Sequence, residues 1–109
     1  MDQKDQTIIS ELKNRIPDNV KDHICKVIAF GSRVRDNGKD DSDLDLLILL
    51  DRKTPELLHI IEDIAYQVMW DYDFRPIISI KLFTEANFNK CLAEGFSFYK
   101  NIEREGISL

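Results

Sequence analysis

Residues 31–50 decide the fold, and they read Gly31-Ser-Arg-Val-Arg-Asp-Asn-Gly-Lys-Asp-Asp-Ser-Asp-Leu-Asp-Leu-Leu-Ile-Leu-Leu50. The segment opens with a Gly-Ser pair directly after an apolar run and closes with a second apolar run. Asn37-Gly38 is a turn signal within the polar residues between them. The pattern predicts two strands joined by a polar loop, in which a short helix can begin near Ser32. Asp43 and Asp45 stand at the start of the second strand.

The apolar runs on either side of this loop are short and rich in strand-forming residues, so they predict strands over residues 24–30 and 44–50. Beyond Asp45 the second run is apolar on both faces, which is typical of a central strand covered on both sides. Upstream, apolar residues at helical spacing predict an amphipathic helix over residues 4–16 that ends near Pro17.

Downstream, Thr54-Pro55-Glu56 combines a hydroxyl cap, a proline in the first turn and an early acid, which together predict a helix start. The buried stripe of this helix is predicted at Leu57, Ile61, Ile64, Ala65 and Val68. A third strand is predicted from about Tyr72 through Ile80, and Pro76 within it indicates an edge strand or a bulge.

A last helical region is predicted from Thr84-Glu85, with Gly95 breaking or bending it and Gly106 ending it. The second and third strands are joined by a helical crossover, so they should be parallel. Gly31 and Asp43 can lie close together only if the first two strands are antiparallel. We therefore expect one α/β (α+β) domain over residues 1–109, with a small mixed sheet and helices packed against it.

Composition narrows the classes of function. The chain has 109 residues, 43% hydrophobic and 32% charged, as in ordinary globular domains, and its net charge of −5 argues against strong nucleic-acid binding. Cys25 and Cys91 lie in apolar patterns, which favours reduced core residues over a disulfide or a zinc site. No leader pattern and no apolar run of membrane-spanning length occurs, so a cytoplasmic protein is expected.

Asp43 and Asp45 suggest metal chemistry. Side chains alternate along a strand, so the two carboxylates share one face with their Cα atoms roughly 7 Å apart. Such a pair can hold two Mg²⁺ ions about 4 Å apart, the arrangement used for displacement at phosphorus. Gly31 allows a close backbone approach, Ser32 offers a hydroxyl and an amide, and Arg33 and Arg35 can add charge-assisted bonds to phosphate.

The order of Gly31-Ser32, ten intervening residues and Asp43-Leu-Asp45-Leu-Leu resembles the signature of the polymerase-beta-type nucleotidyltransferase superfamily. Within it, the chain looks most like the minimal nucleotidyltransferase (MNT) branch, whose tail is similar to residues 99–106, Tyr-Lys-Asn-Ile-Glu-Arg-Glu-Gly. The resemblance implies that Gly31 and Ser32 hold the triphosphate of ATP or another nucleotide and that Asp43 and Asp45 bind two magnesium ions.

The same resemblance implies a third carboxylate on the following strand. Asp71 and Asp73 are the candidates, and Asp73 is favoured because Tyr72-Asp73-Phe74 mirrors the apolar-Asp-apolar pattern of that strand. One departure concerns the loop, where the family often has glycine after the second arginine. Here Asp36 takes that place and glycine appears at position 38, which affects the expected role of Arg35.

The leading hypothesis is a magnesium-dependent nucleotidyltransferase that moves a nucleoside monophosphate, AMP from ATP, to an acceptor hydroxyl. A chain of this size leaves little room for an acceptor-binding domain, so the acceptor is expected on another macromolecule. The resemblance implies an antitoxin that adenylylates a tyrosine of a HEPN-domain ribonuclease toxin. The alternatives are neutralisation of a partner by contact alone, through the aromatic C-terminal helix, and transfer to a small molecule such as an aminoglycoside, which would require a dimer.

Overall fold

The fold is a four-stranded mixed sheet between two layers of helices. The computed structural model describes residues 1–35 and 42–109. The sheet has the order β3-β2-β1-β4, and its strands are β1 (Ile24–Phe30), β2 (Leu44–Leu50), β3 (Ile78–Thr84) and β4 (Ile107–Ser108). β1 is antiparallel to β2 and to β4, whereas β2 is parallel to β3. These directions confirm the predicted mixed sheet, and the first two strands have the predicted bounds.

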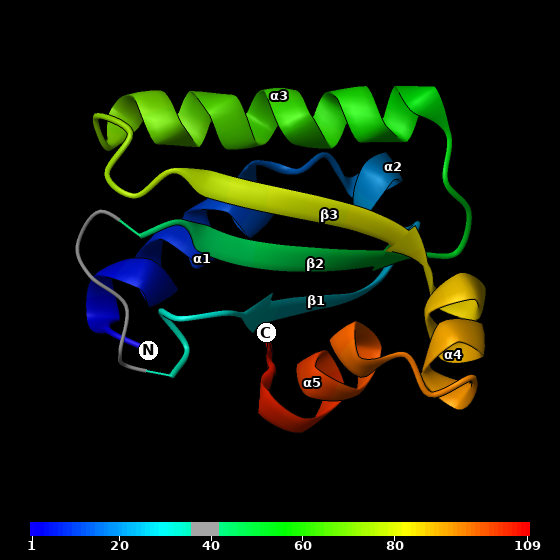
Figure 1. Ribbon diagram of the computed structural model, residues 1–109. Coiled ribbons are helices and arrows are strands. Elements are labelled where there is room, and N and C mark those ends of the chain that lie inside the picture. Colours follow the sequence, from blue (N-terminus) through cyan, green and yellow to red (C-terminus); the bar gives the residue numbers. More distant parts are fainter. Residues whose placement is uncertain (36–41) are drawn as a thin grey trace.

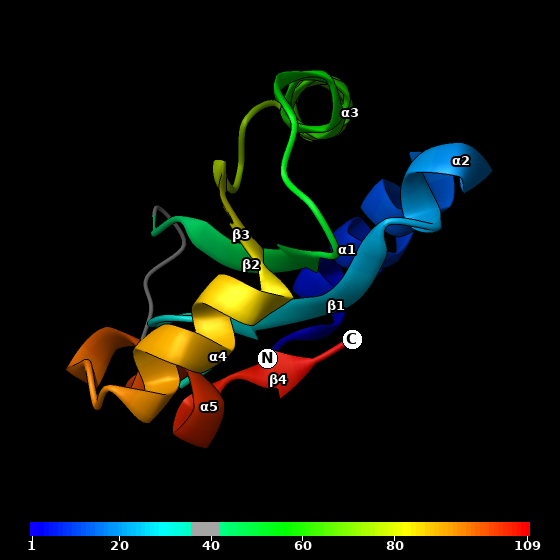
Figure 2. The ribbon, with the colours of Figure 1, turned by 90° about the vertical axis from the view of Figure 1, so that its right-hand side faces the viewer.

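Helices cover both faces of the sheet (Figures 1 and 2). The helices are α1 (Gln3–Arg15), α2 (Asp18–Lys21), α3 (Pro55–Asp71), α4 (Glu85–Ala93) and α5 (Ser97–Glu105). Apolar residues of α1 and α3 pack on one face of β2 with Leu46 and Ile48, and those of α4 and α5 pack on the other with Leu47 and Leu49. β2 is therefore the doubly covered central strand that its sequence predicted.

α3 begins as predicted. Thr54 is its N-cap, and the Thr54 hydroxyl accepts a hydrogen bond from the amide of Leu57. The five residues predicted as its buried stripe are the five that the structure buries: Leu57, Ile61, Ile64, Ala65 and Val68. None of the described helices is long and apolar enough to cross a membrane.

The predicted third strand, residues 72–80, is wrong over residues 72–77. α3 continues to Asp71, and residues 72–77 form a turn before β3 starts at Ile78. In this turn the Phe74 amide donates to the Met69 carbonyl at 2.8 Å, and Asp73 and Phe74 both have φ of 57°. Aromatic and acidic residues alternate in Tyr72-Asp73-Phe74, as they can on a strand. The backbone amides of these residues, however, donate to carbonyls of α3 and end that helix.

The last helical region is broken at Gly95, as predicted, and Gly95 with φ of 85° separates α4 from α5. The short α2 and β4 were not predicted, since four-residue and two-residue elements leave no periodic pattern. Cys25 is exposed rather than buried, and both cysteines are free.

Candidate active site

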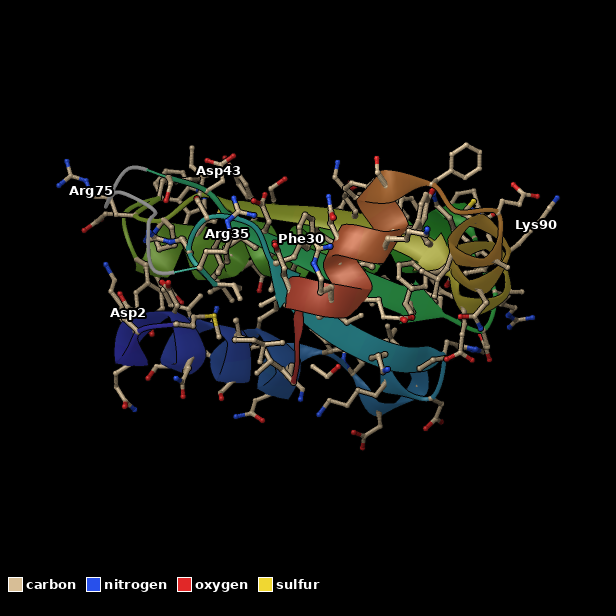
Figure 3. All side chains as sticks on the ribbon, turned by 60° about the horizontal axis from the view of Figure 1, so that its bottom comes forward. Asp2, Phe30, Arg35, Asp43, Arg75 and Lys90 are labelled. Carbon is tan, nitrogen blue, oxygen red and sulfur yellow. The ribbon has the colours of Figure 1, made fainter. Side chains whose placement is uncertain are left out.

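The site candidates gather where β1 ends and where β2 and β3 begin, the edge that the topology predicted (Figure 1). In the sheet register Phe30 lies beside Asp45 on one side, and Ser79 of β3 lies beside Asp45 on the other. Asp45 alternates with Leu47 and Leu49 along β2 and therefore faces the α4–α5 side of the sheet. In Figure 3, Asp43 and Arg35 lie in the left half of the molecule, between Arg75 and Phe30, and Lys90 of α4 lies at the right-hand end.

Gly31 lies directly against Asp45. Its φ is 85°, which L side chains rarely adopt, and a Cβ built on its backbone would overlap the Asp45 carboxylate. The Gly31 carbonyl accepts a hydrogen bond from the Val34 amide at 3.2 Å, so residues 31–35 turn sharply after β1. This part is a turn and not a helix, and the rest of the loop, with Asn37-Gly38, Asp40 and Asp41, lies outside the described residues.

The two predicted metal carboxylates interact electrostatically. Asp43 is exposed and Asp45 is half-buried. Burial raises the pKa of Asp45 above its usual range, the negative charge of Asp43 raises it further, and the positive charge of Lys81 opposes both effects. Two like charges at one edge, one of them partly desolvated, favour a bound cation. This donor set fits Mg²⁺, which takes one or two protein carboxylates and completes its shell with phosphate oxygens and water.

Asp73, the residue predicted as the third carboxylate, lies in the turn before β3 and not on that strand. β3 lies wholly within the described residues and reads Ile-Ser-Ile-Lys-Leu-Phe-Thr, without an acid, and Ser79 occupies the register position beside Asp45. Asp73 is exposed in the turn before the strand. Within residues 1–35 and 42–109, no three His, Cys, Asp or Glu side chains are grouped so that they could hold a metal ion.

Asp71, the reserve candidate, is the last residue of α3 and forms an ion pair with Arg15 of α1. The neighbouring Tyr72 hydroxyl donates to Glu11 of the same helix at 3.0 Å. Asp71 therefore joins the two helices on the opposite side of the sheet from the face that Asp45 occupies. The structure brings Gly31, Asp43 and Asp45 to one edge, but it places neither Asp71 nor Asp73 on the strand beside them.

The two arginines of the turn pair with different elements. Nε of Arg33 lies 3.4 Å from a carboxylate oxygen of Asp5 in α1, and the Arg33 side chain is only 9% exposed. Nη1 of Arg35 lies 3.2 Å from Glu105 at the end of α5, and the Arg35 side chain is 48% exposed. Arg33 thus attaches the turn to α1, whereas Arg35 is accessible for the predicted phosphate contact.

Two neighbours of Asp45 were missed by sequence reasoning. Ser79 and Lys81 alternate on β3, and both belong to the strand whose start was misplaced. Their signal was the run Ile-Ser-Ile-Lys-Leu, in which polar residues alternate with apolar ones as on a strand with one open face. Placing that strand at residues 78–84 would have brought both residues to the site.

The comparisons with known proteins agree with this arrangement. Residues 9–107 match the family described as nucleotidyltransferase domain. The chain is similar to a Methanocaldococcus jannaschii protein named "putative protein adenylyltransferase", with 28% identity over 102 residues that cover 94% of each chain. No solved structure matches the chain significantly.

Proposed function

The chain belongs to the nucleotidyltransferase domain family, and from this premise we propose that it transfers AMP from ATP to a hydroxyl group of a partner protein. The observation that carries the proposal is the contact of the Gly31 turn with Asp45. This contact brings the Gly31 turn and a carboxylate pair to one sheet edge. The acceptor class, a partner protein, follows the name of the Methanocaldococcus jannaschii relative, "putative protein adenylyltransferase".

In this proposal each residue has a defined task. Gly31 and Ser32 bind the triphosphate through backbone amides and a hydroxyl, and Arg35 exchanges its bond with Glu105 for one with a phosphate oxygen. Asp43 and Asp45 would hold two magnesium ions, which supply the positive charge that a triphosphate requires during displacement at its α-phosphorus. Lys81 adds positive charge beside Asp45 on the same face of the sheet.

The proposed reaction is an in-line displacement. The acceptor oxygen forms a bond to the α-phosphorus, the bond from that phosphorus to the oxygen bridging to the β-phosphorus breaks, and pyrophosphate leaves. The acceptor proton passes to water, because β3 presents Ser79 and Lys81 beside Asp45 rather than a carboxylate. Positioning and electrostatics therefore account for the catalysis.

The proposed acceptor is a tyrosine of a HEPN-domain toxin, by the resemblance to MNT antitoxins. The experiment is to incubate the protein with ATP, Mg²⁺ and such a partner and to measure the intact mass of the partner. A gain of one AMP on a tyrosine, lost in Asp45→Asn and kept in Asp51→Asn at the other end of β2, supports the proposal. An unchanged partner mass, with folded protein that binds ATP, contradicts the acceptor assignment.

Two observations favour a second function, neutralisation by contact. β3 contains no carboxylate, and exposed aromatic side chains are available for a partner, with Phe96 54% and Trp70 60% exposed. The double variant Asp43→Ala/Asp45→Ala separates the two functions. If it still neutralises the partner, contact is sufficient. If it binds the partner without neutralising it, the chemistry is required.

A further inference from the structure

A cavity of about 200 Å³ lies between α5 and the end of β1, and Gly31, which contacts Asp45, is one of its lining residues. Its lining includes Gly31 and Arg35 of the turn, so it is continuous with the proposed phosphate site. From α5 it is lined by Phe98, Asn101 and Glu105 among others. The cavity plays no part in the chemistry described above.

The walls of this cavity are aromatic. The rings of Phe30 and Phe98 pack edge to face with centroids 5.9 Å apart, and Phe83 of β3 contacts Phe98 at 6.5 Å. Although the neighbouring rings hold it in place, Phe98 remains 37% exposed. An aromatic ring that is fixed by its neighbours and open on one side is a stacking surface for a flat heterocycle.

The rim of the cavity is polar. Asn101 accepts a hydrogen bond from Arg104 at 3.0 Å, which positions its amide group. Side-chain amides pair with the donor and acceptor edges of nucleobases. The Arg35–Glu105 ion pair links the turn to α5 at the same place, so the phosphate turn and the aromatic wall are held together.

We propose that this cavity is the nucleobase subsite of the nucleoside triphosphate, with the base stacked on Phe98 and its edge against Asn101. The inference rests on the proposed function and extends it, since it assigns α5 to the substrate. The triphosphate binds the Gly31–Ser32 turn, and the base lies in the adjoining cavity, which shares Gly31 and Arg35 with that turn.

The experiment measures the binding of ATP and of inorganic tripolyphosphate, each with Mg²⁺, by titration calorimetry. Phe98→Leu removes the stacking ring but keeps an apolar side chain. Its matched control is Phe96→Leu, because Phe96 precedes the same helix, is 54% exposed and does not line the cavity. Circular dichroism confirms that both variants are folded.

Phe98→Leu should weaken ATP binding about tenfold, because a base–aromatic stack contributes on that order. Binding of tripolyphosphate, which has no base, should be unchanged. Phe96→Leu should leave both affinities as in the wild type. Asn101→Ala should change the order of preference among ATP, GTP, CTP and UTP.

Two results overturn the subsite. One is an unchanged ATP affinity in Phe98→Leu. The other is an equal loss of affinity for ATP and for tripolyphosphate, because Phe98 would then support only the conformation of the phosphate turn. If Phe98→Leu unfolds, Phe98→Tyr, which retains the stacking ring, must bind ATP within twofold of the wild type. Failure of the wild-type protein to bind any nucleoside triphosphate would instead overturn the proposed function itself.

Discussion

Gly31 and Asp45 are packed so closely that a methyl group at position 31 would overlap the Asp45 carboxylate. Gly31→Ala should therefore destabilise the protein by about 3 kcal/mol, from the unfavourable φ and from the overlap, and it should abolish nucleotide binding. Gly95→Ala is the matched control, since Gly95 has the same φ of 85° and a Cβ built on its backbone would meet only the Lys100 side chain, at 3.8 Å. That variant should lose only about 1 kcal/mol.

Chemical unfolding measures both free energies. The double variant Gly31→Ala/Asp45→Ala should recover part of the stability lost in Gly31→Ala, because the carboxylate is no longer there to be overlapped. Nucleotide binding should not recover. Equal destabilisation in Gly31→Ala and Gly95→Ala would show that the contact with Asp45 is unimportant.

Asp45→Asn should stabilise the protein when magnesium and nucleotide are absent. Burial and the charge of Asp43 raise the pKa of Asp45, so its charged form is unfavourable in the folded state at neutral pH. Asp45→Asn should therefore show a higher free energy of unfolding than the wild type in urea unfolding at pH 7. With Mg²⁺ and ATP, the wild type should gain stability and Asp45→Asn should not. A variant that is less stable than the wild type without ligand would contradict this explanation.

Arg33→Gln should destabilise the protein more at pH 7.5 than at pH 4.5. Burial raises the pKa of Asp5, which is only 2% exposed, and the charge of Arg33 partly opposes that rise. Because the pKa of Asp5 is higher in the folded state than in the unfolded state, stability falls as pH rises from the unfolded to the folded value. Removing Arg33 raises the folded-state pKa of Asp5 further, so this pH interval becomes wider. The loss at pH 7.5 should be about 3 kcal/mol.

Urea unfolding at the two pH values measures this loss. The effects of other titrating groups cancel when the free energy of unfolding of the variant is subtracted from that of the wild type at each pH. Arg35→Gln is the control, because the Arg35–Glu105 pair is exposed and should contribute little at either pH. A pH-independent loss in Arg33→Gln would contradict the role of Asp5.

Ser79→Asp should create the third carboxylate that β3 lacks. The new acid would lie beside Asp45, so without metal the variant should lose about 1 kcal/mol of stability through like-charge repulsion. Divalent-ion affinity should rise, as measured by the shift of melting temperature with Mg²⁺ concentration. Ser79→Asn, of the same size but neutral, should show neither effect. If Ser79→Asp and Ser79→Asn respond equally to Mg²⁺, the Asp45–Ser79 register does not describe a metal site.

The elements that were predicted correctly are those whose local sequence pattern agrees with their position in the fold. β2 is apolar on both faces and buried on both, and Thr54 caps α3 in the way its hydroxyl predicted. The Gly31–Asp45 edge followed from the directions of three strands. The start of β3 was misplaced because Tyr72-Asp73-Phe74 alternates like a strand while its backbone bonds return to α3.

The partners of the charged residues were beyond sequence reasoning for another reason. Arg33 and Arg35 are two residues apart in one turn, yet one pairs with Asp5 of α1 and the other with Glu105 of α5. Only tertiary packing separates them. The cavity beside Gly31 could not be predicted from the sequence either, because Phe30 and Phe98 are far apart in the chain and meet only in the folded protein.

Nucleotide transfer at the edge formed by Gly31 and Asp45 can be tested by incubating the protein with Mg²⁺ and a HEPN-domain partner, using ATP labelled at the α-phosphate in one sample and at the γ-phosphate in another. Label is expected on the partner from the α-phosphate only, and none with Asp45→Asn. Label from the γ-phosphate, or equal α-label with Asp45→Asn, would contradict transfer at this edge.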